Sequence, residues 1–324
     1  MNGDADARWL AAAACLAERA RPLSRPNPAV GAIVVRDGIV VGRGWTRPGG
    51  RPHAEAMALL EAAGAAHGGT IYVTLEPCAH LSERGPACAD LLVEARIARA
   101  VIGVEDPDPR TAGAGIAHLE AHGIAAELAR DEACRASLAG YLARTALGRP
   151  HVTLKLAVTA DGFIARADGT SKWITGEAAR AHVHRERARC DAIVVGAGTL
   201  RADAPRLDVR LEGLANRSPH RLVLTTLRAP AGWEALSGPG AIHGLADAQY
   251  LFVEGGAKTA DAFLAEGLVD RLLLYKAPVA FGEGIAAFAD PGPSGVPRGW
   301  RLADRRRLGS DTLEVYTPGR SEGA

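Results

Sequence analysis

The stretch TIYVTLEPCAHLSERGPACADLLVEARI, residues 70–97, decides the fold that we expect for the first part of the chain. Its first residues are rich in β-branched and aromatic side chains and run into a Glu-Pro-Cys turn, which is typical of a buried strand. Residues 86–97 predict a helix, with Pro86 near its start. A strand that leads directly into a helix is the repeating unit of an α/β fold.

The same alternation continues on both sides of this stretch. Residues 29–45 predict a β-hairpin around Asp37-Gly38, the strongest short hairpin signal. The other predicted elements of this part are a helix at 53–64, a strand at 99–106, and helices at 113–123 and 131–148. Such alternation predicts an α/β sandwich with a largely parallel sheet.

A domain boundary is expected after residue 147. Gly148 and Pro150 end the preceding helix, and a new β-rich run follows at once. We therefore predict one domain at 1–147 and a second at 148–324. The second domain alternates again, with strands at 148–159, 191–199, 220–226, 249–256 and 270–280, helices at 177–190 and 258–267, and a final pair of strands within 298–319.

Composition and charge limit the classes of function. The chain has 324 residues and a net charge of +1, whereas nucleic-acid binders usually carry a basic surplus. No apolar run approaches the roughly 20 residues of a membrane span. The cysteines are odd in number and sparse, which argues against a disulfide framework and favours a reducing cytoplasm. They are Cys15, Cys78, Cys88, Cys134 and Cys190.

Four residues predict a catalytic zinc centre. His53 lies at the start of a helix, Cys78 follows a strand and a proline, and Cys88 lies where the next helix begins. One imidazole and two thiolates leave the fourth tetrahedral position of zinc open, as in catalytic sites. Glu55, two residues after His53, is placed to move the proton of an activated water. This is the H-x-E and P-C arrangement of zinc deaminases.

A structural zinc site is the alternative interpretation. It would need a fourth protein ligand, and His80 is the nearest candidate in the sequence. The cysteines are also ten residues apart (88 − 78 = 10) rather than three. The intervening loop is long enough to fold over a substrate.

The whole chain resembles the bifunctional riboflavin-biosynthesis deaminase–reductases. RPNPAVGAIVVRDG, PHAEAMAL, YVTLEPCAH and EDPDPRTAGAGI match the deaminase domain, and VTLKLAVTADGFIA, SKWITGEAARAHVHRERARCDAIVVGAGT and LFVEGGAKTADAFL match the reductase domain. The resemblance implies a cytidine-deaminase-like three-layer α/β/α domain followed by a dihydrofolate-reductase-like α/β domain. It also implies one Zn²⁺ per chain, NADPH, and small-molecule phosphoribosylaminopyrimidine substrates.

Two reactions follow from this resemblance. The first is hydrolytic removal of the C2 amine of 2,5-diamino-6-(5-phosphoribosylamino)pyrimidin-4-one. The second is NADPH-dependent reduction of the ribosyl group of the resulting aminouracil to a ribityl chain. We expect a cytoplasmic enzyme, a homo-oligomer, with no nucleic-acid or membrane partner.

Several residues of the first domain are candidates for substrate binding beside that resemblance. The amide of Asn27 can read a pyrimidine edge, although asparagine beside proline also favours a plain turn. The remaining candidates lie on the long loop between Cys78 and Cys88 (the cysteine loop) or after a strand, where loops line the crevice of an α/β sheet. They are His80, Arg84, Asp106 and Asp108. Thr46 stands where many family members carry histidine.

The second domain carries candidates for both substrate and cofactor. Lys155, flanked by apolar residues in a strand, needs an anionic partner such as a phosphate, the substrate or Glu254. Gly255-Gly256 can let backbone N–H groups approach a phosphate, although tight strand–helix packing would also explain both glycines. By resemblance, the other substrate residues are Ser171, Arg187, Leu207 and Arg210, and the other cofactor residues are Ala157, Trp173, Thr199 and Asp203.

Two rival functions remain open at the level of the sequence. The segment between about 226 and 250 is shorter than in most members of the family. The second domain could therefore be a non-catalytic dimerisation module. The first domain could instead be a nucleotide or tRNA deaminase.

Overall fold

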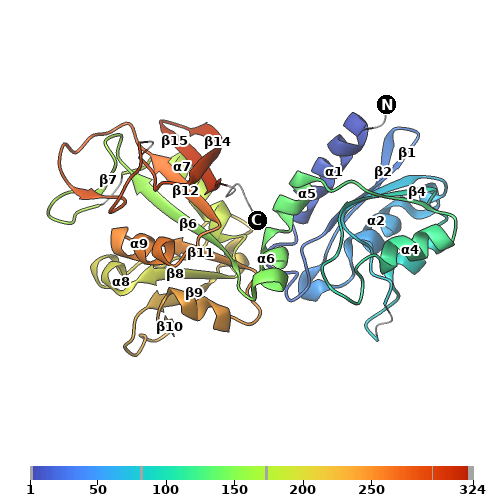
Figure 1. Ribbon diagram of the computed structural model, residues 1–324, viewed down its shortest axis with the longest axis horizontal. Helices are drawn as coiled ribbons and strands as arrows, with labels where there is room; N and C mark the ends of the chain where they lie inside the picture. Colours follow the sequence, from blue (N-terminus) through green and yellow to red (C-terminus); the bar gives the residue numbers. More distant parts are fainter. Residues whose placement is uncertain (1–2, 81–82, 172–173, 294, 320–324) are drawn as a thin grey trace. The chain divides into compact units, whose positions relative to one another are not determined.

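The structure is a computed structural model that describes residues 3–80, 83–171, 174–293 and 295–319. The chain divides into two compact units, one ending at Gly148 and the other beginning at Arg149. The predicted boundary after residue 147 lies beside this division. Each unit has its own sheet (Figure 1). Each also has its own hydrophobic core.

The first unit contains a five-stranded sheet in the order β2-β1-β3-β4-β5. β1 pairs antiparallel with β2 and β3, whereas β3, β4 and β5 run parallel. The strands are β1 (Gly31–Arg36), β2 (Ile39–Trp45), β3 (Thr70–Leu75), β4 (Arg99–Val104) and β5 (Ala125–Leu128).

Helices cover both faces of this sheet. A Cβ at Gly31 would lie 2.0 Å from the Ala13 carbonyl oxygen in α1, and a Cβ at Gly44 would lie 2.0 Å from the Ala54 oxygen in α2. Gly44 pairs with Ala32, the neighbour of Gly31, so these two glycines face opposite sides of the sheet. The helices are α1 (Gly3–Ala17), α2 (Ala54–Ala62), α3 (Cys88–Glu94), α4 (Ala114–Ala121), α5 (Glu132–Ser137) and α6 (Ala139–Leu147), with 3₁₀ turns η1 (Pro48–Gly50) and η2 (Ala63–Ala66). The predicted three-layer α/β/α arrangement is confirmed.

The second unit contains an eight-stranded sheet in the order β10-β9-β8-β11-β6-β12-β15-β14. The first six strands of this order are parallel, and β15 and β14 continue it antiparallel. The strands are β6 (His151–Val158), β8 (Ala192–Gly196), β9 (His220–Leu224), β10 (Glu234–Leu236), β11 (Tyr250–Glu254), β12 (Arg271–Lys276), β14 (Trp300–Leu308) and β15 (Asp311–Pro318). β7 (Phe163–Ala165) and β13 (Ile285–Ala286) form a separate pair.

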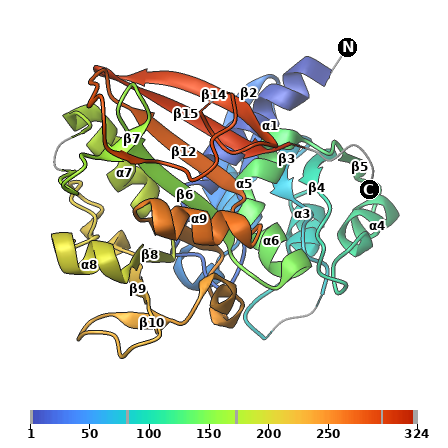
Figure 2. The same cartoon turned by 60° about the vertical axis from the view of Figure 1, so that its left-hand side comes forward.

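Two apolar clusters cover the two faces of this second sheet. Along β8, Val194 belongs to one cluster and its neighbours Ile193 and Val195 belong to the other, as alternation along a strand requires. Phe263 of α9 packs in the first cluster and Val183 of α7 in the second. The helices are α7 (Glu177–Arg187), α8 (Ala197–Asp203) and α9 (Ala257–Ala265), with η3 (Ala215–Arg217) and η4 (Pro239–Gly244). Figure 2 shows α9 lying across the strands.

Three predictions about elements are corrected. The helix predicted at 131–148 is two helices, α5 and α6, with Leu138 between them at φ −95° and ψ 4°. The strand predicted at 191–199 ends at Gly196, and helix α8 begins at Ala197. Strand β5, whose sequence is Ala-Ala-Glu-Leu, was not predicted because it carries no β-branched residue.

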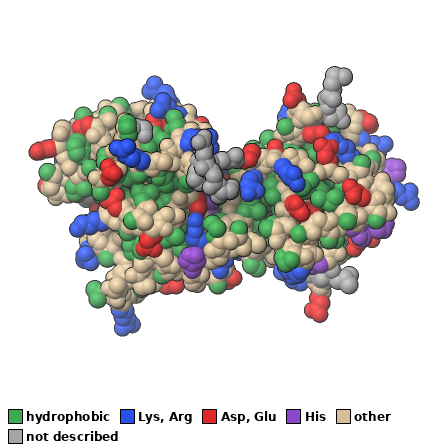
Figure 3. All heavy atoms as spheres, viewed as in Figure 1, with side chains coloured by type: hydrophobic (Ala, Val, Ile, Leu, Met, Phe, Trp, Pro, Cys, Tyr) green, Lys and Arg blue, Asp and Glu red, His purple; other side chains and the backbone are tan. Residues whose placement is uncertain are grey.

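Surface charge and helix length agree with the composition. None of the helices in the described part of the chain combines the length and apolar character needed to cross a membrane. On the face drawn in Figure 3, basic and acidic side chains are interspersed over both units, as a net charge of +1 predicts.

Candidate active sites

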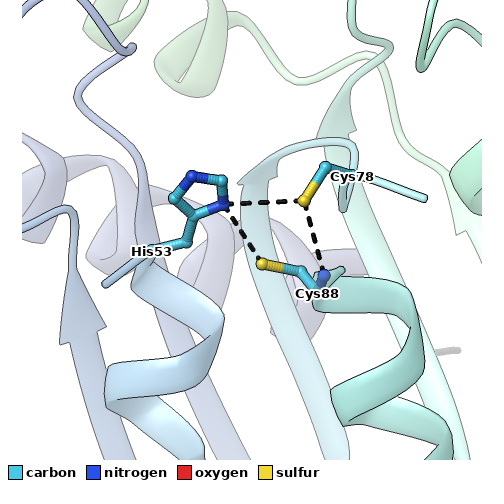
Figure 4. A group of neighbouring side chains, drawn as sticks. All are labelled: His53, Cys78 and Cys88. Atoms are coloured by element: carbon cyan, nitrogen blue, oxygen red, sulfur yellow. Dashed lines mark hydrogen bonds between the residues drawn. The ribbon is translucent and has the colours of Figure 1, made fainter. Parts of the chain in front are cut away.

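The three predicted zinc ligands meet at one point of the first unit. His53 is the N-cap of α2, Cys78 follows β3, and Cys88 is the first residue of α3. The Nδ1 atom of His53 lies 3.3 Å from the Cys88 Sγ and 3.6 Å from the Cys78 Sγ (Figure 4). All three ligand atoms lie within 4.8 Å of one another.

The chemistry of this donor set fits zinc. The Cys88 side chain, with help from the His53 ring and the Cys88 backbone N–H, holds the pKa of the Cys78 thiol well below its usual value. A thiolate is therefore favoured before any cation binds, and one imidazole with two sulfurs is a known zinc donor set. Within residues 3–80, 83–171, 174–293 and 295–319, this is the cluster of histidine, cysteine and acidic side chains that can hold a metal.

Glu55 lies beside the ligand cluster in the first turn of α2. Only 3% of its surface is exposed. Burial raises the pKa of this carboxyl to about 7, and the neighbouring Cys88 thiol interacts with it. A carboxyl with that pKa can both take up and return a proton near neutral pH.

The ligand cluster opens into a cavity of about 410 Å³. The five residues predicted to bind the deaminase substrate all line it: Asn27, His80, Arg84, Asp106 and Asp108. Asn27 Nδ2 donates to the Gly50 carbonyl oxygen at 3.2 Å and lies 3.3 Å from His53 Nε2. Asn27 thus contacts the ring of a metal ligand as well as the cavity.

His80 does not join the metal-binding cluster. Its Nδ1 atom lies 3.3 Å from the Thr111 hydroxyl, which is buried. A fourth ligand from His80, as the structural-zinc alternative required, is therefore not supported among the described side chains.

The two predicted aspartates differ in their environment. Asp106 is buried, accepts the Tyr141 hydroxyl at 2.7 Å, and has a pKa raised by burial. Asp108 pairs with the Arg110 guanidinium, which lowers the pKa of this carboxyl to about 2. Asp108 is thus an ionised, paired acid, whereas Asp106 lies deeper in the wall of the cavity.

Glu76 is a buried residue of this wall that the sequence interpretation missed. Its Oε1 accepts the backbone N–H groups of Gly115 and Ile116 at 2.9 and 3.1 Å. Its Oε2 accepts those of Asp106 and Gly113 at 3.2 and 3.0 Å. The signal was available in the sequence, because an acid between a buried strand and Pro77 needs internal donors. Tyr141 was also missed, and nothing in its local sequence marks it.

The second unit contains a cavity of about 780 Å³ at the carboxyl ends of its parallel strands. Ligands of open α/β sheets bind at this edge. The predicted substrate and cofactor residues within the described part of the chain all line it: Lys155, Ala157, Ser171, Arg187, Thr199, Asp203, Leu207, Arg210, Glu254, Gly255 and Gly256. Trp173 lies outside the described residues.

Lys155 has the carboxylate partner that its burial requires. Glu254 lies opposite it in the β6–β11 register, with Lys155 Nζ 3.8 Å from Glu254 Oε2. Arg187 binds the same carboxylate, at 2.6 Å from Nε to Oε1 and 3.0 Å from Nη2 to Oε2. Although burial opposes it, these two cations lower the pKa of Glu254, while burial lowers the pKa of Lys155.

The two glycines that follow β11, Gly255 and Gly256, are explained by different contacts. A Cβ at Gly255 would lie 2.7 Å from Thr259 Cβ, so tight packing of β11 against α9 explains this glycine. A Cβ at Gly256 would meet only Ile164, at 4.0 Å, so the backbone there borders open cavity. The first turn of α9 therefore faces the cavity with backbone N–H groups, which suits a phosphate.

Comparison with known proteins covers both units. A family model described as the cytidine and deoxycytidylate deaminase zinc-binding region matches residues 4–104. A second, described as the RibD C-terminal domain, matches residues 150–233 and 243–313. The gap between the two stretches falls within the segment at 226–250 that the sequence marks as shortened.

Related proteins match most of the chain. The riboflavin biosynthesis protein RibD of Corynebacterium ammoniagenes is 40% identical over 84% of this chain and 85% of its own. The RibD protein of Mycobacterium tuberculosis (strain ATCC 25618 / H37Rv) is 37% identical over 89% of this chain and 90% of its own. The chain belongs to the RibD family. The solved structure of Acinetobacter baumannii RibD, form 1, is 33% identical with a TM-score of 0.85, over 98% of this chain and 100% of the other.

Membership of the RibD family confirms the predicted order of a deaminase domain followed by a reductase domain. The protein is a bifunctional deaminase–reductase of riboflavin biosynthesis. The RibD reductase domain and the zinc-binding deaminase region indicate a zinc ion and a nicotinamide-type cofactor. The interpretations as a tRNA deaminase or as a deaminase with a non-catalytic module are not supported by these matches.

Proposed function

We propose that the first unit removes the C2 amine of 2,5-diamino-6-(5-phosphoribosylamino)pyrimidin-4-one and that the second reduces the resulting aminouracil with NADPH. The observation that carries the proposal is the meeting of His53, Cys78 and Cys88 beside buried Glu55. A related structure from Thermotoga maritima, 30% identical with a TM-score of 0.85, is described as a diaminohydroxyphosphoribosylaminopyrimidine deaminase and 5-amino-6-(5-phosphoribosylamino)uracil reductase.

In the deaminase, zinc held by these three residues supplies a Lewis acid that activates water at neutral pH. Glu55 accepts a proton from the attacking water and passes it to the ring nitrogen; it then accepts the proton of the new C2 hydroxyl and passes that one to the departing amine. The C2–N bond is exchanged for a C2–O bond, so the reaction consumes one water and releases one ammonia. Asn27, His80 and Asp106 hold the ring in the cavity.

In the reductase, NADPH supplies the hydride when it is bound. Gly256 and the first turn of α9 would hold the cofactor phosphates, with Thr199 and Asp203 of α8 lining the same cavity. Lys155 contacts the sugar end of the substrate. The Glu254 carboxylate partly balances the positive charge of Lys155. Arg187, Ser171 and Arg210 complete the substrate wall, together with Leu207 and, on the cofactor side, Ala157.

The finer parts of the proposal concern stoichiometry and assembly. One zinc ion per chain follows from a single cluster of three ligands in the described residues. We also propose that the protein is a homo-oligomer and that it acts on small molecules in the cytoplasm. The cysteine content supports the reducing compartment, because none of the five cysteines is paired in a disulfide.

A coupled assay tests the proposal. Purified protein is incubated with the diaminopyrimidine phosphate, with and without NADPH, and ammonia and NADPH oxidation are followed together. We expect ammonia in both reactions and NADPH oxidation only when the aminouracil has formed. Ammonia without any NADPH oxidation would support a non-catalytic second unit, and ammonia released only from cytidine, dCMP or tRNA would overturn the deaminase assignment.

A further inference from the structure

Three arginines line the described wall of the deaminase cavity: Arg51, Arg84 and Arg110. Two of them have partners in the protein. Arg110 is paired with Asp108, and Arg84 Nη2 donates to the Gly49 carbonyl oxygen at 2.7 Å. Arg51 makes no hydrogen bond and no ion pair with any residue that the structure describes. It is half-buried, so its charge is partly removed from water without a compensating anion.

Arg51 lies where two segments of the cavity wall cross. It precedes the metal ligand His53 by two residues, and its Nη1 atom would be 3.3 Å from a Cβ at Gly85. In the opposite direction, Arg84 of the cysteine loop reaches back to Gly49. The Arg51 guanidinium is therefore held between the segment before α2 and the cysteine loop.

Thr46, a further residue of the cavity wall, carries no positive charge. Thr46 is 2% exposed and lines the same cavity. Its hydroxyl accepts the Val30 backbone N–H at 3.0 Å. Thr46 is thus engaged with the backbone, and an anion in the cavity must find its cation elsewhere.

We propose that Arg51 binds the phosphate of the phosphoribosyl group when the deaminase substrate is in the cavity. The proposal rests on the proposed function, which places a phosphate monoester there. Such a monoester carries close to two negative charges at neutral pH. A planar guanidinium binds it through two parallel hydrogen bonds, and Arg51 still has all its donors available. Arg51 is then a specificity residue that separates phosphorylated from unphosphorylated pyrimidines.

The test crosses enzyme variants with two substrates, the diaminopyrimidine ribosyl phosphate and its dephosphorylated riboside. For Arg51→Gln we expect KM for the phosphate to rise about tenfold with little change in kcat, because a substrate-binding ion pair is lost. The kinetics on the riboside should not change, and Arg51→Lys should restore part of the affinity. Arg47→Gln is the matched control, since Arg47 packs over the Trp45 ring at 4.7 Å and is not part of the cavity wall.

Zinc content and the reductase activity of the same preparations report whether each variant is folded. The proposal is overturned if Arg51→Gln loses the same factor on both substrates, or if it behaves as wild type on both. If wild-type protein releases ammonia from neither substrate, the proposed function itself fails. If wild type turns over both equally well, the deaminase assignment stands and the phosphate contact does not.

Discussion

At the scale of single residues, both active sites depend on charged groups withdrawn from water. Glu55 is almost fully buried beside two thiols, and Lys155 and Glu254 share a cavity wall with Arg187. Removing one member of a buried ion pair costs far more than replacing the whole pair with well-packed apolar residues, because the remaining charge is left without a partner. The cluster of Lys155, Arg187 and Glu254 has two cations and one carboxylate, so its members are not equivalent.

Lys155→Met and Glu254→Gln should therefore behave differently. Lys155→Met leaves Glu254 with both of its bonds from Arg187, so the unfolding free energy of the second unit should change by less than about 1 kcal/mol. Reduction of the aminouracil should nevertheless fall on the order of 100-fold. Glu254→Gln leaves two cations without a carboxylate and should cost about 3 kcal/mol.

Urea unfolding and NADPH oxidation measure both effects. The interpretation is wrong if Lys155→Met is the less stable of the two variants, or if it reduces the aminouracil at the wild-type rate. Ammonia release by the first unit serves as the internal control in each variant.

At the same scale, residue types with a strict chemical need could be predicted from the sequence, and residues that act through distant contacts could not. His53, Cys78 and Cys88 were found because few other combinations of side chains suit zinc. Tyr141 was missed because its role depends on where α6 passes Asp106. Asp108 was proposed without its partner Arg110, although the two are only two residues apart.

At the scale of elements, two buried carboxylates fix the helices and loops of the first unit. Glu76 ties the segment that follows β4 to the turn carrying Cys78, through four backbone N–H groups. Asp6 ties α1 to the sheet, accepting the Tyr72 hydroxyl at 2.8 Å and two bonds from Arg99 at 2.9 and 2.8 Å.

Glu76→Gln should loosen the loop that carries Asp106. A glutamine presents an NH₂ group to two backbone donors, and each unsatisfied buried donor costs about 1–3 kcal/mol. We expect a lower thermal stability of the first unit and a raised KM for the diaminopyrimidine, with zinc content and reductase kinetics unchanged. Glu105→Gln, at an exposed neighbouring position, is the control. A normal KM in a Glu76→Gln protein that retains zinc would contradict this role.

Asp6→Asn should reduce stability in a way that depends on pH. The hydrogen bonds from Arg99 lower the pKa of Asp6 below its ordinary 3.8, so the native state favours the ionised form. This contribution is fully present above that value and is lost as the pH falls through the lower, folded-state pKa. The variant should be less stable by about 2 kcal/mol at pH 7 and approach wild type in strong acid. Denaturant titrations between pH 7 and pH 2 measure this, and a difference that does not shrink below the ordinary pKa of 3.8 would contradict it.

Elements with strong local signals could be predicted, and those decided by tertiary contacts could not. The hairpin β1–β2 was predicted from the pair Asp37-Gly38. In the structure both residues adopt the positive φ that the turn requires, 51° and 75°. The break between α5 and α6 falls at Leu138, whose two neighbours are neither glycine nor proline, and Gly140 lies inside α6. β5 forms because its backbone completes the parallel ladder beside β4, and its four residues carry little β propensity of their own.

At the scale of the whole molecule, the chain is two units with separate cores and separate cavities, and each cavity carries its own chemistry. The α/β class of both units was predictable from the alternation of elements. The family resemblance added the identity of each reaction. The segment at 226–250, which we predict to be shorter than in most members of the family, contains a short parallel strand, β10, and the turn η4. The residues that line the reductase cavity lie outside it.

Removal of zinc should therefore separate the two activities. Chelation of the full-length protein should abolish ammonia release and lower the thermal stability of the first unit, because metal binding stabilises the folded site. The rate of NADPH oxidation with the aminouracil should change by less than about twofold, since each unit has its own core and its own cavity. A parallel loss of both activities on chelation, reversed together by added zinc, would show that the two units are coupled.

The most direct measurement is made on one preparation of Glu55→Gln, in which zinc content, ammonia release and NADPH oxidation are determined together. The account predicts about one zinc per chain, ammonia release reduced on the order of 1,000-fold, and normal reduction of the aminouracil. Ammonia release at the wild-type rate from a Glu55→Gln protein that holds its zinc would contradict it.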